Sequence, residues 1–94
     1  MEIKQVDQKE RGFFIARIDG KDAGLMTYAH VESGVFLINH TEVNKVFSGQ
    51  GVGNSMVMAA VQYARENELK MIPRCPFARS VFDRVPEISD VLYL

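Results

Sequence analysis

Hydrophobic and polar residues alternate along the first half of the chain, and this period of two predicts β-strands. We expect strands at residues 1–6, 13–18, 23–31 and 35–43, with a polar turn at residues 7–12. Asp19-Gly20 is typical of a two-residue hairpin, because both central positions of that turn require positive φ. The last three strands should form an antiparallel meander. Apolar residues fall on both of its faces, which predicts a covering layer on each side for part of its length.

The period changes in the second half to the i, i+3/i+4 spacing of a helix. The apolar or small residues of this helical stripe are Met56, Val57, Ala60, Val61 and Ala64. The helix should end near Asn67-Glu68, and the apolar run at residues 69–73 suits a strand reached by a crossover. Pro76 can begin a second helix over residues 77–84, because the first helical position needs no N–H. The C-terminal tail fits either a strand or a short helix.

These elements predict an α/β fold with a mainly antiparallel sheet, a crossover helix and a C-terminal helix. Of the 94 residues, 47% are hydrophobic and 24% charged, and no linker or repeat interrupts them, so we expect one domain over residues 1–94. The 11 basic and 12 acidic residues form no basic run, which argues against a nucleic-acid partner. No signal peptide or membrane span is evident, and the single Cys75 excludes an internal disulfide and a zinc cage. We therefore expect a cytoplasmic protein without a metal site.

Gly49, Gly51 and Gly53 alternate directly before the predicted helix. The first amides of a helix lack partners within it and attract anions, so a glycine-rich loop here can bind phosphate and let its oxygens approach the main chain. The alternative is a tight connection and nothing more. Two other phosphate motifs fail, because Asn54 replaces the third glycine of a dinucleotide fingerprint and Gly53-Asn54-Ser55 replaces the Gly-Lys-Ser of a triphosphate loop.

The segment SGQGVG, residues 48–53, resembles the acyl-CoA pyrophosphate loop of the GCN5-related N-acetyltransferases, usually written [Gln/Arg]-x-x-Gly-x-[Gly/Ala]. Gly51 and Gly53 fit this pattern. Ser48 departs from it, which we interpret as weakening the affinity, because main-chain N–H groups make most phosphate contacts. INHTEV, GQGVG, ARENELKMI and CPFA, in this order, resemble a small single-domain subgroup of the superfamily over residues 15–82.

The resemblance implies acetyl-CoA as the cofactor. It implies that the strand before the loop runs beside the pantetheine arm, where main-chain groups of Glu42 and Val43 bond the arm and the Val43 N–H polarises the thioester carbonyl. The cofactor-binding residues it predicts are Thr41, Glu42, Val43, Ser48, Gly49, Gln50, Gly51, Val52, Gly53 and Asn54. Larger members have a helical segment between their first two strands that forms much of the acceptor wall. Here Asp19-Gly20 connects the strands directly, which predicts an open groove for a protein or peptide amine, or a partner chain that completes the site.

Three side chains are candidates for the chemistry. His40 and Glu42 share one face of their strand, where either could accept a proton or hold a water. The alternatives are a hydrogen-bonded structural histidine and a solvated carboxylate. Cys75 follows the strand at residues 69–73, near the point where the family's strands splay apart to admit the thioester. It would line the acetyl end of the groove or carry the acetyl group, and its alternative is an inert buried thiol.

The first functional hypothesis is an N-acetyltransferase that moves an acetyl group from acetyl-CoA to an unidentified amine. The second is a non-catalytic acyl-CoA-binding module with a regulatory role. The third is an adaptor that kept the fold and lost the ligand, which Ser48 favours.

Overall fold

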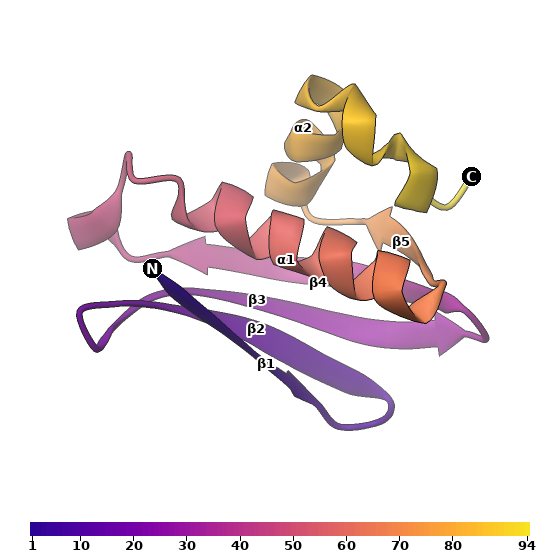
Figure 1. Ribbon diagram of the computed structural model, residues 1–94, viewed down its shortest axis with the longest axis horizontal. Helices are drawn as coiled ribbons and strands as arrows, with labels where there is room; N and C mark the ends of the chain where they lie inside the picture. The colour runs from indigo at the N-terminus through magenta and orange to yellow at the C-terminus, as the bar shows by residue number, and fades with distance from the viewer.

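The computed structural model describes all residues from Met1 to Leu94 and contains one five-stranded sheet whose strands lie in chain order (Figure 1). The strands are β1 (Glu2–Asp7), β2 (Arg11–Ile18), β3 (Lys21–Glu32), β4 (Val35–Val43) and β5 (Lys70–Pro73). Neighbours from β1 to β4 pair antiparallel, and β5 pairs parallel with β4. The parallel pair needs a crossover, and α1 (Val52–Asn67) supplies it.

Shorter elements complete the chain. The 3₁₀ helix η1 (Lys45–Phe47) lies between β4 and α1, α2 (Pro76–Arg84) follows β5, and the 3₁₀ helix η2 (Pro86–Val91) follows α2. The tail combines both of its expected forms, since Leu92 after η2 makes an isolated bridge to Met71. The expected α/β architecture is confirmed.

Two of the three hairpin turns differ in length. Asp19 and Gly20 have φ angles of 51° and 76°, as their turn type requires. The turn expected at residues 7–12 is wrong in extent, because Asp7 pairs with Gly12 and both lie in strands. Only residues 8–10 connect β1 to β2, and Lys9 has a φ of 73° in this tight loop.

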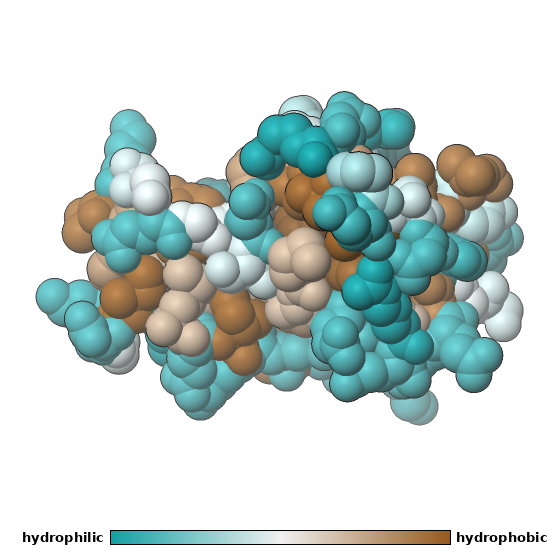
Figure 2. Space-filling model, turned by 45° about the horizontal axis from the view of Figure 1, so that its top comes forward, coloured by the Kyte–Doolittle hydropathy of each residue, from teal (hydrophilic) through white to brown (hydrophobic).

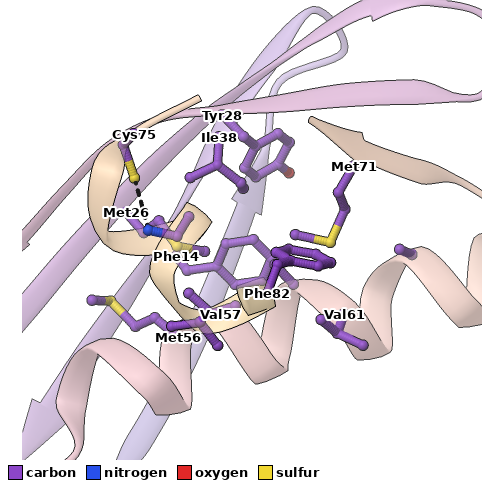
Figure 3. Close-up of a cluster of buried hydrophobic side chains, with 14 of the residues drawn as sticks. Phe14, Met26, Tyr28, Ile38, Met56, Val57, Val61, Met71, Cys75 and Phe82 are labelled. Carbon is purple, nitrogen blue, oxygen red and sulfur yellow. Dashed lines mark hydrogen bonds between the residues drawn. The ribbon is translucent and has the colours of Figure 1, made fainter. Parts of the chain in front are cut away.

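The hydrophobic core lies between the sheet and the helices. The predicted stripe of α1 is buried and packs against Phe14, Met26 and Ile38 of the sheet, while Phe82 of α2 closes the same cluster (Figure 3). Figure 1 shows α1 lying along the sheet, with α2 and η2 beyond it near β5. Burying each large apolar side chain contributes roughly 1.5–3 kcal/mol, so this one interface holds α1 against the sheet.

The opposite face of the sheet is not covered, which corrects the expectation of a layer on each side. Ile15 pairs with Leu25, Ala29 with Leu37 and Leu37 with Ile72, so these residues alternate with the core residues of the same strands. All five are half-buried, and none belongs to the core cluster or packs against it. We call this surface the bare face. Alternation showed which residues share it, but alternation carries no information on what covers a face.

A polar cluster around Asp7 ties β1 to β3 and α1. The hydroxyls of Tyr28 and Tyr63 donate to Asp7 Oδ2 at 2.6 and 3.1 Å, and His30 Nε2 lies 3.0 Å from the same oxygen. The hydrogen bond from Tyr28 is the main reason that the pKa of Asp7 falls from 3.8 to about 2. Burial and the hydrogen bond to Asp7 raise the pKa of Tyr28. His30, which has no partner evident in the sequence, is therefore part of a structural network.

Candidate functional site

The loop from β4 to α1 is fixed to the sheet by Asn44. Its amide N–H donates to the Ala23 carbonyl at 2.8 Å, and its side chain accepts from the Val46 N–H at 3.0 Å. These bonds hold the start of η1, and Ser48 then donates to the Lys45 carbonyl at 3.1 Å. Sequence reasoning missed Asn44, although an asparagine directly after a strand is a recognisable signal for a side-chain-capped turn.

The alternating glycines of this loop serve distinct purposes. Gly49 and Gly51 have φ angles of 81° and 74°, and a Cβ built on either would meet nothing within 4 Å. Glycine is therefore needed at these two positions for its backbone conformation, not for lack of space. A Cβ on Gly53 would lie 2.5 Å from the ring of Phe77, so this glycine lets α2 pack against α1. The expectation that all of them serve close approach of a ligand is thus incomplete, because the Cβ of Gly53 is excluded by a side chain of the protein itself.

The first amides of α1 donate no hydrogen bond within the chain. Gly51 is the N-cap and supplies no side-chain bond, and the first turn holds no acidic residue. The Ser55 amide donates to the Gly51 carbonyl at 2.9 Å, which leaves the amides of Val52, Gly53 and Asn54 before the first helical hydrogen bond. The space beside Gly49 and Gly51 is open, so the loop fits a diphosphate that approaches from solvent.

Arg84 adds a positive charge at this point. Its Nη2 donates to Asn54 Oδ1 at 3.4 Å, which brings the end of α2 to the start of α1. A cation beside a helix N-terminus is unfavourable by itself, because both carry positive charge, but an anion between them would relieve this repulsion.

The glycine loop does not line a hollow: none of the surface hollows includes residues 48–54. The loop therefore stands on an open surface rather than inside a cleft. Figure 2 shows apolar side chains at the end of the molecule where η1 lies, and Val46 there is 79% exposed.

The β4 and β5 strands separate beside this loop. Their ladder ends at Ile38 and Pro73, and the amides of Arg74 and Cys75 then both donate to the Ile38 carbonyl at 3.1 and 3.2 Å. Residues 39–43 of β4 continue with β3 alone as partner. One edge of β4 is thereby left open to a ligand, at the segment that contains Thr41, Glu42 and Val43.

Cys75 closes the inner end of this opening. It is the N-cap of α2, its Sγ accepts from the Ala78 N–H at 3.4 Å, and its side chain is 7% exposed (Figure 3). Thr41 Oγ1 lies 3.1 Å from the same sulfur. The thiol is buried, as its inert interpretation expects, yet it touches the strand that the resemblance places beside the pantetheine arm.

His40 and Glu42 lie on the other side of the sheet. They pair with Thr27 and Leu25, which places them on the bare face, whereas Thr41 pairs with the core residue Met26. His40 Nε2 is 3.5 Å from Glu42 Oε2, and the two side chains are 58% and 64% exposed. The candidates therefore form two groups, Cys75 with Thr41 under the helices and His40 with Glu42 on the bare face. A side chain this exposed does not fit the alternative of a hydrogen-bonded structural His40.

Two absences complete the description. No group of three or more histidine, cysteine, aspartate or glutamate side chains is arranged to hold a metal ion. Neither α1 nor α2 has the length and apolar character that crossing a membrane requires.

Comparison with known proteins agrees with the family resemblance and with the fold. The sequence pattern of the GCN5-related N-acetyltransferases matches residues 13–91. The chain is 31% identical over 70 residues to protein NATD1 of Xenopus tropicalis, over 73% of this chain and 63% of NATD1. It thus spans less than two thirds of that relative's length.

Solved structures give the same result. A candidate GCN5-like N-acetyltransferase from Staphylococcus aureus, determined by NMR, has a TM-score of 0.72 and 32% identity, over 98% of this chain and 87% of that one. A candidate streptothricin acetyltransferase from Bacillus anthracis, crystallised with acetyl coenzyme A, shares the fold with a TM-score of 0.61 and 19% identity, over 70% of this chain and 39% of that one. On the match over residues 13–91 and the agreement in fold, the chain belongs to the GCN5-related N-acetyltransferase family.

Proposed function

We propose that residues 1–94 form a single domain that binds acetyl-CoA and transfers its acetyl group to an amine. The observation that carries the proposal is the conjunction of free helix-start amides at residues 52–54 with the open β4 edge at residues 39–43. A diphosphate on the amides and an extended arm along the strand edge would follow one continuous path. Family membership supports acetyl-CoA as the ligand on this path.

The side chains take separate roles in this proposal. The amides of residues 51–54 hold the diphosphate, Arg84 adds charge, and the main chain of Val43 bonds the arm at the open edge. The amide of Gln50 is not among them, because it donates to the Phe47 carbonyl at 3.3 Å. The main chain of Glu42 faces β3, as that of Asn44 does when it donates to the Ala23 carbonyl. Cys75 and Thr41 line the acetyl end from the helix side. The amine arrives from the bare face, where Glu42 or His40 accepts its proton. The amine nitrogen then forms the new bond to the acetyl carbon, the bond from that carbon to sulfur breaks, and the thiolate of coenzyme A leaves.

Calorimetry with acetyl-CoA, followed by coenzyme A release with a panel of amines, tests the proposal. We expect binding, and release above the hydrolysis background. Binding without amine-dependent release would favour the acyl-CoA-binding module, and no heat at high acetyl-CoA would favour the adaptor, which Ser48 makes a definite alternative.

Cys75 variants separate lining from covalent transfer. Cys75→Ser keeps a side chain that can cap α2, whereas Cys75→Ala loses the cap and destabilises the protein by about 1 kcal/mol. We expect both to retain transfer, because Cys75 only lines the site. Mass spectrometry of wild-type protein with acetyl-CoA alone provides the second readout. An acetyl group on Cys75, together with loss of transfer in both variants, would contradict the lining role and establish a covalent one.

A further inference from the structure

The bare face carries a hollow of about 350 Å³ beside His40 and Glu42. It is lined by Ile15, Asp22, Ala23, Gly24, Leu25, Glu42, Val43 and Asn44. Its volume is at the small end for ligand sites, which suits a single side chain or a short aliphatic molecule. Because Glu42 lines the hollow and also lies 3.5 Å from His40 Nε2, the hollow is continuous with the proposed proton acceptors.

The hollow is lined by both apolar side chains and carboxylates. Ile15 and Leu25 pair across β2 and β3 and supply apolar surface that no part of the chain covers. Asp22 and Glu42 supply two carboxylates, of which Asp22 already accepts from Arg17 Nε at 2.9 Å. An apolar stem with a cationic tip complements this combination, since the stem covers Ile15 and Leu25 while the tip meets Glu42.

From this complementarity we propose that the hollow is the acceptor subsite and that it selects a primary amine on an unbranched aliphatic chain, of which a lysine side chain is the polypeptide form. The inference rests on the proposed function. A polyhydroxylated sugar amine would place hydroxyls against Ile15 and Leu25 without partners, and a peptide α-amine has no long apolar stem to cover them. The bound ammonium loses one proton to Glu42 or His40 before the nitrogen attacks the acetyl carbon. The second proton passes from the nitrogen to the departing thiolate of coenzyme A, which leaves as the thiol.

The first experiment follows rates of coenzyme A release with n-propylamine, n-butylamine, n-pentylamine, glucosamine and alanine amide. We expect kcat/KM to rise about fourfold for each added methylene, because each buried methylene strengthens binding by that factor, and to be lowest for the last two compounds. Leu25→Thr should flatten the dependence on chain length. Leu37→Thr is the matched control, because Leu37 lies on the bare face outside the hollow. Equal rates for all five amines, or equal effects of the two variants, would overturn the subsite.

A binding measurement separates this inference from the proposed function. Titration of ¹⁵N-labelled protein with n-pentylamine, followed by NMR, should shift the amides of Ala23, Leu25 and Val43 whether or not turnover occurs. If these shifts occurred without any release of coenzyme A, they would support amine binding in the hollow and contradict the proposed transferase activity. Shifts that are absent, or that centre on other residues, would overturn the subsite even if some amine is acetylated.

Discussion

At the scale of single residues, several predicted positions lie where expected but have different partners. Gly49, Gly51 and Gly53 were recognisable from their spacing, yet only a structure could show that a ring contacts the last of them. Cys75 and Thr41 are separated by 34 positions, and their contact depends on how α2 returns to β4. His40 and Glu42 were correctly placed together, because residues two apart in a strand share a face.

Asp7 should make stability dependent on acid pH. Its pKa is lowered from 3.8 to about 2, so its contribution is fully present above pH 4 and is lost as the pH falls through about 2. We expect Asp7→Asn to reduce the free energy of unfolding at pH 7 by about 1 kcal/mol, a modest value because the side chain is 34% exposed. Urea unfolding between pH 7 and pH 2, followed by circular dichroism, measures this.

The difference between the variant and wild type should shrink as the pH falls from 4 to 2. Asp83→Asn, on the exposed side of α2, is the control and should change stability little at any pH. If the stability difference between wild type and Asp7→Asn stayed constant down to pH 2, folding would not lower the pKa of Asp7. That result would contradict the role assigned to its hydrogen bonds.

At the scale of elements, local signals predicted most of the fold. The 3.6-residue period located α1 to within a residue, Asp19-Gly20 located a hairpin, and Pro76 located the start of α2. Two features were not predictable in this way. The short connection between β1 and β2 depends on Lys9 adopting a φ of 73°, which nothing in its residue type favours. The absence of a layer on the bare face depends on where the helices pack, which the strand pattern does not encode.

The contact between α1 and α2 at Gly53 supplies a test of element packing. Gly53→Ala would place a Cβ 2.5 Å from the ring of Phe77, and we expect a loss of about 1–3 kcal/mol in the free energy of unfolding from overpacking. Adding Phe77→Leu should recover part of this loss, because the ring edge is removed. Gly49→Ala is the matched control. Its cost of about 1 kcal/mol comes from a φ of 81°, so Phe77→Leu should not relieve it.

Denaturant unfolding of the single and double variants gives the coupling energy between positions 53 and 77. Additive effects at these two positions would mean that α2 does not press on the start of α1. In that case the packing of α2 against α1 would not hold Arg84 Nη2 at 3.4 Å from Asn54 Oδ1. The positive charge proposed to assist the phosphate loop would then not lie beside it.

At the scale of the whole molecule, ligand binding should be visible as a gain in stability. A ligand that binds only the folded chain raises its stability by about 2.7 kcal/mol at a concentration of 100 Kd, which corresponds to roughly 10 °C or more for a domain of this size. Because the helix-start amides at residues 52–54 are proposed to hold the diphosphate, coenzyme A should raise Tm most, ADP less and pantetheine least. Thermal unfolding with each compound measures the order, and added salt should reduce the shifts that depend on phosphate.

The variant Gly51→Val links this order to the loop. Its β-branched side chain disfavours the φ of 74° at the N-cap of α1, so the loop should lose the geometry that directs its amides outward. The variant protein will be less stable without ligand, and the relevant quantity is therefore the increase in Tm on adding coenzyme A, which should fall sharply. Val46→Ser, which removes an exposed apolar side chain in η1 and leaves the glycines intact, should keep the response to ADP. If pantetheine stabilised the wild type as strongly as coenzyme A, and Gly51→Val left the response unchanged, the affinity would reside in the strand edge at residues 39–43 rather than in the glycine loop.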